Sequence, residues 1–213
     1  MKKILLIMTL IVSLSILMAV ESAPSETVGY FKKSVAGNSW NVLSLPFAYG
    51  SLDVNMVLGD QFADGDLVQD ITTGNNTTYY DGFGWFGDLE FLEYGVGYWV
   101  YRFNAATDYF VLGTVDPQSL TLTVTPGWSV FALNEARDIA IFDLPITGAM
   151  DGDLIQDITT GNNTTFYDGF GWFGDLEFME PTQAYWYYTT GAGFSWTYNP
   201  GRGVAASPLR TSK

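Results

Sequence analysis

This 213-residue sequence contains two clusters of aspartates whose spacing suits metal binding. The pattern D-G-D-x-x-x-D occurs twice, and its carboxylates belong to Asp64, Asp66, Asp70, Asp151, Asp153 and Asp157. Calcium takes carboxylate oxygens near a glycine turn, although an EF-hand loop would need a glutamate at its twelfth position. Each cluster offers three of the six or more oxygens that calcium requires, so the alternative is a turn in which the aspartates accept backbone hydrogen bonds. Calcium is one candidate cofactor, and the sequence predicts no other.

An aromatic ribbon follows each aspartate cluster, and its chemistry suits stacking on sugar rings. Aromatic faces pack against apolar surfaces, and neighbouring carboxylates accept hydrogen bonds from hydroxyls. The candidate binding residues are Tyr80, Asp81, Phe83, Trp85, Phe86, Asp88, Tyr167, Asp168, Phe170, Trp172, Phe173 and Asp175. The alternative is that most of these rings form the core, because large apolar side chains are mostly buried. We expect a core position for four other tryptophans, namely Trp40, Trp99, Trp128 and Trp186.

The composition excludes most catalytic chemistries. The chain has no histidine and no cysteine, so Ser-His-Asp triads, Cys-His pairs and histidine metal sites cannot form. Carboxylates such as Asp88, Glu90 and Glu93 could in principle hold an acid and a base at glycosidase separation. No motif fixes that geometry, and solvent-facing strand charges explain them more simply. We predict that the protein is not an enzyme.

Overlapping N-x-Thr sequons begin at Asn75 and Asn76, and Asn162 and Asn163 repeat them. They fall at the tip of a predicted hairpin, where a glycan acceptor must be exposed. The alternative is an asparagine-rich turn without glycans, which the bacterial resemblance described below favours.

Residues 1–22 have the form of a secretory signal peptide. Lys2 and Lys3 precede an apolar run from Ile4 to Val20, and cleavage after Ser22 leaves small residues at both required positions. An uncleaved membrane anchor is the alternative, because the run is nearly long enough to span a bilayer. We therefore expect a secreted or cell-surface protein. The net charge of −14 would repel nucleic acids and anionic lipids, so we expect no nucleic-acid partner and membrane attachment only through an uncleaved signal segment.

An internal repeat organises the chain. Residues 64–93 and 151–180 lie 87 positions apart and are identical at 27 of 30 positions, the differences being Val68/Ile155, Tyr79/Phe166 and Leu92/Met179. The likeness extends outward to Trp40 and Trp128, and to Trp99 and Trp186. It predicts two units, 28–116 and 117–203, followed by a flexible tail at 204–213.

The elements that position these residues are predicted to be strands. Leu120, Leu122 and Val124 alternate with threonines, which is typical of a half-buried strand. A hairpin is predicted from Val68 to Asp81, with Gly74, Asn75 and Asn76 supplying positive φ at its turn. One short helix or turn is predicted per unit, within 51–59 and 134–144. The fold class is therefore all-β, with two tandem sandwich-like or barrel-like modules.

Two motifs in each unit carry a family resemblance. W-N-V-L-S-L-P at 40–46 and G-V-G-Y-W-V at 95–100 resemble the start and end of small β-rich modules of exported bacterial surface proteins. Such modules read G-W-N-L-I-S-L-P and P-G-x-G-Y-W-V/I, and they occur in tandem. The resemblance covers most of each unit, although the second unit has Ala132-Leu133-Asn134 and Thr182-Gln183-Ala184 at these places. It implies an extracellular module and carries over no catalytic residue.

The near-identity of the two passages has two possible causes. Cores tolerate volume-conserving changes and surfaces tolerate almost any change, so packing alone does not require it. Either both copies present one surface to one kind of partner, or gene conversion copied the passage. The first cause predicts a structural or adhesive protein of the cell surface or extracellular matrix, which binds itself or another surface protein through a duplicated face. The alternative is a carbohydrate-binding protein that grips a polysaccharide with its aromatic ribbon.

Overall fold

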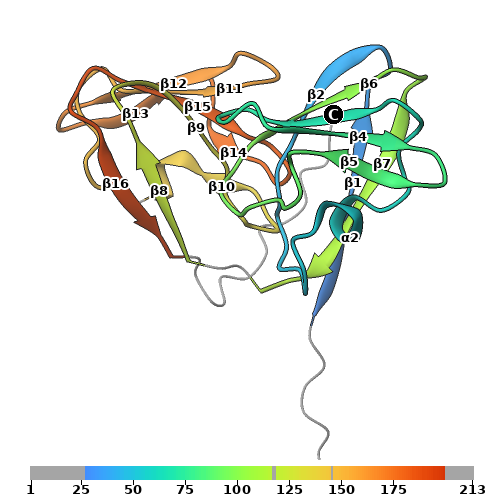
Figure 1. The fold of residues 1–213 in the computed structure, drawn as a ribbon. Helices are drawn as coiled ribbons and strands as arrows, with labels where there is room; N and C mark the ends of the chain where they lie inside the picture. Colours follow the sequence, from blue (N-terminus) through green and yellow to red (C-terminus); the bar gives the residue numbers. More distant parts are fainter. Residues whose placement is uncertain (1–26, 117–118, 145, 200–213) are drawn as a thin grey trace, which may run out of the picture.

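The computed structural model describes residues 27–116, 119–144 and 146–199, and it is all-β with two similar sandwich modules (Figure 1). The predicted signal peptide at 1–22 and tail at 204–213 lie outside the described residues. Every strand pair is antiparallel, and neither five-stranded sheet of the described chain closes into a barrel. Of the two predicted architectures, the sandwich is therefore the one formed.

The first module packs a five-stranded sheet against a two-stranded one. The larger sheet has the order β2 (Ser39–Leu43), β6 (Tyr98–Arg102), β3 (Leu67–Asp70), β4 (Asn76–Tyr80), β5 (Gly84–Gly87). The smaller sheet pairs β1 (Val28–Val35) with β7 (Thr107–Thr114). Side chains of both sheets meet in one hydrophobic core, which includes Tyr98 and Tyr109.

The second module repeats this plan. Its larger sheet has the order β9 (Gly127–Phe131), β15 (Tyr185–Thr189), β11 (Leu154–Asp157), β12 (Asn163–Tyr167), β13 (Gly171–Gly174). The covering pair is β8 (Leu120–Val124) with β16 (Phe194–Tyr198), and a short pair joins β10 (Ile139–Ala140) to β14 (Phe178–Met179). The predicted alternation is confirmed in β8, where Leu120, Leu122 and Val124 are buried and the threonines between them are exposed.

The predicted hairpin forms in both modules. The backbone N–H of Asp70 donates to the carbonyl of Asn75, and β3 and β4 pair on either side of this turn. Only Gly74 takes positive φ, at 78°, so the expectation that Asn75 and Asn76 would share that role is wrong. One glycine is enough here because the side chain of Asp70 holds the rest of the turn by accepting from the N–H groups of Thr72 and Thr73.

The two modules differ in the segment that bridges their strands. The first has the helix α2 (Val54–Leu58), whose start is capped by the Asp53 carboxylate. The second has only the 3₁₀ turn η1 (Ile141–Asp143), with Ala140 at the capping position and no side-chain cap. Pro145 follows in the sequence, and Leu144 before it is extended, as the residue preceding a proline prefers. A missing cap and a following proline explain why the helix is not repeated.

A pair of equivalent hydrogen bonds joins the modules. The N–H of Ser44 donates to the carbonyl of Thr182 at 3.1 Å, and the N–H of Ala132 donates to the carbonyl of Gly95 at 2.9 Å. Ser44 and Ala132 occupy the same place in the repeat, as do Gly95 and Thr182. Each module therefore gives the other the same donor and the same acceptor, which is the pattern of a twofold, isologous contact.

Backbone strain marks the same junction. Gly95 has a φ of 82°, and Thr182 at the equivalent position has a φ of 64° although its side chain is β-branched. Such a conformation costs a β-branched residue roughly 1–3 kcal/mol. Thr182 is the third residue of a local turn in which the N–H of Gln183 donates to the carbonyl of Glu180, and its own carbonyl accepts from Ser44 and Lys33 of the other module.

Gly97 and Ala184 meet at the centre of this junction. A Cβ on Gly97 would lie 2.5 Å from the Cβ of Ala184, which is its own counterpart in the repeat. Ala184 is fully buried and belongs to a small hydrophobic cluster with Val42 and Ala132. The modules can approach this closely only because one of the two equivalent positions lacks a side chain.

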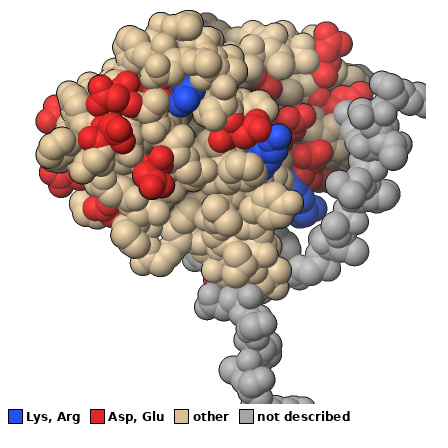
Figure 2. Space-filling model, turned by 90° about the vertical axis from the view of Figure 1, so that its right-hand side faces the viewer, with Lys and Arg blue, Asp and Glu red and all other residues tan. Residues whose placement is uncertain are grey.

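The charge on the described surface is mainly acidic. Figure 2 shows groups of acidic side chains around largely uncharged areas, with few basic side chains among them. One basic group, Lys33, is half-buried at the junction, where its ammonium donates to the carbonyl of Thr182 at 3.2 Å. No helix within the described ranges is long and apolar enough to cross a bilayer.

Candidate functional site

The outward face of the first module's large sheet carries a row of side chains, one from each strand. Successive register partners define this aromatic row, which consists of Trp40, Tyr101, Leu67, Thr78 and Phe86. Neighbouring strands lie about 4.8 Å apart, so the row is about 19 Å long. It forms a strip across the sheet rather than an enclosed pocket.

The second module carries the same row in the same order. Its members are Trp128, Tyr188, Leu154, Thr165 and Phe173. The terminal rings are exposed to the same extent in both copies, with Trp40 at 48% and Trp128 at 50%. Every residue type of the row is therefore repeated, including those contributed by strands outside the near-identical passage.

A second row, the amide row, runs beside each aromatic row. In the first module it consists of Val42, Trp99, Gln69 and Asn76. In the second it consists of Val130, Trp186, Gln156 and Asn163. Val42 and Val130 end the rows in the hydrophobic cluster at the junction, so the two amide rows meet there.

The tryptophans expected in the core lie on this outward face instead. Trp40 stands edge-on to Tyr101 and Trp99, with ring centroids 5.0 and 6.2 Å apart, and Trp128 has matching neighbours. Trp128, Gln156 and Trp186 line an open hollow of about 280 Å³. The prediction was wrong because β6 places Tyr98 and Val100 inward, so the period of two sends Trp99 outward.

The predicted aromatic ribbon divides among three places. Tyr80 and Phe86 lie on the outward face and touch each other with centroids 6.1 Å apart, and Tyr167 and Phe173 do the same. Phe83 and Phe170 stand at turns and are each 80% exposed. Trp85 belongs to the core, where its indole N–H donates to the carbonyl of Gly59.

The carboxylates of the ribbon, those of Asp81, Asp88, Asp168 and Asp175, are exposed. The backbone N–H of Asp81 donates to the carboxylate of Asp64, and that of Asp168 donates to Asp151. Asp175 lines an acidic hollow on the second module together with Asp138 and Glu180. The polar groups beside the outward rings are the amides and hydroxyls of the two rows.

The three differences between the near-identical passages all point inward. Val68, Tyr79 and Leu92 are buried, at 0%, 5% and 0% exposed, and their counterparts Ile155 and Met179 are buried as well. Every half-buried or exposed position of the first passage is identical in the second. If the passage had been copied without later selection on its surface, subsequent changes would not concentrate in the core. Surface substitutions cost little stability, so they would accumulate first. The observed changes fall in the core and leave the shared surface of the two passages unaltered.

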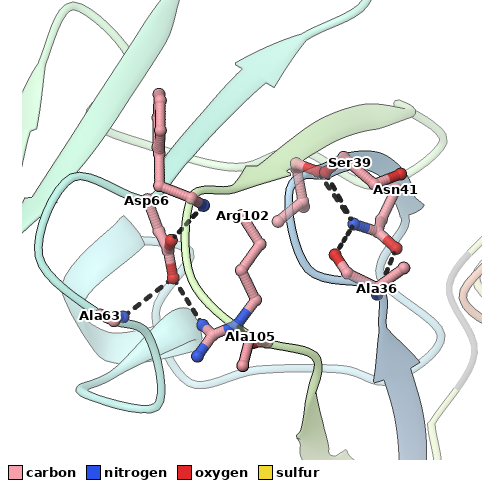
Figure 3. A network of polar contacts seen from close by, with 9 residues as sticks. Ala36, Ser39, Asn41, Ala63, Asp66, Arg102 and Ala105 are labelled. Carbon is pink, nitrogen blue, oxygen red and sulfur yellow. Dashed lines mark hydrogen bonds and ion pairs between the residues drawn. The ribbon is translucent and has the colours of Figure 1, made fainter.

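The aspartates considered for calcium serve the fold. Asp66 is fully buried and accepts from the guanidinium of Arg102 at 2.6 Å and from the N–H groups of Ala63 and Phe103 (Figure 3). Asp70 and Asp157 accept from the backbone N–H groups two and three residues further on, which is the turn given as the alternative. Within the described ranges, no group of three or more acidic side chains converges closely enough to hold a metal ion.

Asp153 takes the place of Asp66 in the second module but has no arginine beside it. Thr189 stands where the first module has Arg102, and the Asp153 carboxylate accepts instead from the hydroxyl of Tyr187 at 2.8 Å. Burial and the neighbouring carboxylate raise the pKa of Tyr187. The other oxygen of Asp153 is buried without a hydrogen-bond partner among the described residues.

The sequon asparagines are accessible. Asn75, Asn76, Asn162 and Asn163 are all exposed at the ends of the two hairpins. Asn76 and Asn163 also belong to the amide rows, so a glycan on either would stand beside the outward face.

No protein-family description, no curated protein and no solved structure matches the chain. The functional argument therefore rests on the geometry of the two modules.

Proposed function

We propose that this protein is an exported adhesive protein, without catalytic activity, that holds a neutral extracellular polysaccharide on two copies of one sheet face. The observation that carries the proposal is the identity of the aromatic and amide rows in the two modules. The signal-like sequence of residues 1–22 supports export.

The chemistry of the rows supports a sugar polymer as the partner. Exposed indole and phenyl rings offer apolar faces for stacking, and Gln69, Asn76 and Thr78 offer amides and a hydroxyl between them. Small-molecule sites are concave and enclose their ligand, whereas this strip suits an extended chain. The acidic surface supports a neutral polysaccharide over an anionic one.

The duplication supports avid attachment. Two equivalent faces on one chain turn the second binding event into an intramolecular one, which raises overall affinity by roughly 10²–10⁴ without new contacts. Self-association through the edge of β5 has less support, because the Asn55 side chain already accepts from the N–H of Trp85 there.

The test is retention on neutral polysaccharides by Trp40→Ala, Trp128→Ala and the double variant. Cellulose, chitin, starch and mannan serve as probes, and Phe110→Ala, which removes an exposed ring from β7, is the control. We expect each single variant to bind at least about tenfold more weakly and the double variant to lose retention, with unchanged melting temperatures. Full retention by the double variant, or no binding of the unaltered chain to any probe, would refute the proposal. Trp85 is unsuitable for this test because it is a core residue.

A further inference from the structure

A hollow beside the last strand of the large sheet occurs in both modules but differs in size. In the first module it measures about 120 Å³ and in the second about 390 Å³. The walls correspond residue by residue, with Trp172, Leu176 and Phe178 where the first module has Trp85, Leu89 and Phe91. The larger volume lies within the range of small-ligand sites, roughly 300–1,000 Å³.

The helix α2 occupies this place in the first module. The side-chain carbonyl of Asn55 accepts from the backbone N–H of Trp85 at 2.9 Å, and the carbonyl of Gly59 accepts from the indole N–H at 3.0 Å. Two acceptors four residues apart on one short helix thus satisfy both donors of one tryptophan. They also cover the free edge of β5.

Neither acceptor has a counterpart in the second module. The backbone N–H of Val54 donates to Glu90, and that of Ile141 donates to Glu177, so the next residues, Asn55 and Phe142, are equivalent. Phe142 has no carbonyl on its side chain and is 74% exposed. Leu144 is extended, so among the described residues the helical turn that ends at Gly59 in the first module has no counterpart.

Trp172 is consequently left open toward the hollow. Trp172 pairs with β12 in the same register as Trp85 pairs with β4. Its backbone N–H therefore points outward at the free edge of the sheet, as that of Trp85 does. No described residue accepts from this N–H or from the indole N–H of Trp172. Ala149 stands where Phe62 packs on Trp85 in the first module, which leaves Trp172 half-buried.

We propose that this hollow binds a segment of a partner protein that supplies what α2 supplies in the first module. The segment offers an asparagine or glutamine side-chain carbonyl to the backbone N–H of Trp172 and, four residues later, a main-chain carbonyl to the indole N–H. Apolar side chains of the segment lie against Ile141 and Leu176. The hollow borders the second aromatic row at Phe173, but the two Trp172 donors do not belong to that row, so the peptide site does not depend on the polysaccharide proposal.

The probe is a synthetic peptide with the sequence of residues 51–62, which contains α2. It is titrated into the full chain labelled with ¹⁵N-tryptophan, and the resonances of Trp172 are assigned with the variant Trp172→Phe. We expect the backbone and indole N–H resonances of Trp172 to shift on binding. A peptide with alanine in place of Asn55 should bind about tenfold more weakly, since it lacks one hydrogen bond to an otherwise open donor.

A variant of the protein provides the matched test. Phe142→Asn places a carbonyl where Asn55 has one, so it should lower peptide affinity about tenfold and shift the Trp172 backbone resonance before peptide is added. Met56→Asn changes an equally exposed residue of the first module and should leave binding unchanged. Three results would each overturn the proposal: no shift of Trp172 at millimolar peptide, shifts confined to Trp128 and Trp186, or equal affinity for the two peptides.

Discussion

Asp66 and Asp153 hold the same buried position in the two modules but face different partners. Asp66 pairs with a guanidinium, whereas among the described residues Asp153 has only neutral donors and one oxygen without a partner. A buried carboxylate without a cation is the costlier arrangement, because desolvation is not offset by an opposite charge. The first module therefore depends on its carboxylate for stability, and the second does not.

This contrast predicts opposite responses to one substitution. Asp66→Asn leaves Arg102 buried and unpaired, so it should lower the free energy of unfolding by about 3–5 kcal/mol. Asp153→Asn keeps an oxygen for Met150 and Tyr187, so it should change stability by less than about 1 kcal/mol. Urea unfolding of both variants measures the difference. Equal losses would show that Asp153 has a cationic partner in solution.

The half-buried Lys33 at the junction should make the stability of the protein depend on pH. Burial lowers the pKa of Lys33 to about 8 from 10.5, although the nearby carboxylates of Asp157 and Glu180 act in the opposite direction. Between these values the unfolded chain holds a proton that the folded chain has released, so Lys33 by itself contributes a rise in stability as the pH increases from 8 to 10. Urea unfolding across this range checks it, and Lys33→Met should remove the rise.

Buried tyrosines change the stability in the opposite direction, and their effect begins below pH 10. Burial raises the pKa of Tyr98, Tyr109 and Tyr185 in the folded chain. The unfolded chain then loses phenolic protons that the folded chain keeps, so stability falls as the pH rises through 10. The unaltered protein should therefore be most stable at about pH 9, where the two opposing effects balance, and a continued rise beyond pH 10 would contradict this assignment.

The role of a residue could be predicted where its partners are close in the sequence, but not where they are far away in it. Asp70 caps a turn formed by the next three residues, which the sequence D-I-T-T-G already favours. Asp66 binds Arg102 across 36 positions, and no local pattern indicates that pair. The outward tryptophans were missed because Tyr98, Trp99, Val100 and Tyr101 form an unbroken apolar run whose facing becomes known only from the strand pairing.

At the scale of elements, the contrast between α2 and η1 matters most. Both segments bridge the same strands, but only α2 has a capping carboxylate, with Asp53 accepting from the N–H of Asn55 at 2.9 Å. The sequence predicted a helix or turn at both places, and both exist. Ala140 cannot cap a helix with its side chain, and Pro145 cannot continue one. These two residues indicate that the second segment stays a turn.

The cap gives a prediction for α2. Asp53→Ala should lower the free energy of unfolding by about 1 kcal/mol, because two N–H groups at the start of the helix lose their acceptor. Asp88→Ala removes the same charge from an exposed loop and is the control, expected within about 0.5 kcal/mol of the unaltered protein. Thermal or urea unfolding compares the two. Equal effects would mean that charge, rather than capping, stabilises this region.

At the scale of the whole molecule, the junction tests the twofold relation directly. Gly97→Ala should cost about 1–3 kcal/mol through overpacking against Ala184. The double variant Gly97→Ala with Ala184→Gly exchanges the two equivalent residues and should restore most of that loss. Gly50→Ala is the control, because a Cβ there meets nothing within 4 Å. Additive losses in the double variant would contradict a shared, symmetric contact.

The twofold contact also bears on how the protein behaves when it is dilute. Two separate modules joined by this small, isologous patch would dissociate as their concentration fell, because dimerisation follows mass action. Covalent linkage fixes the effective concentration of each module for the other at the millimolar level, whatever the volume around them. The duplicated chain thus behaves as a dimer that dilution cannot separate, and its two faces keep their spacing even when single molecules are far apart.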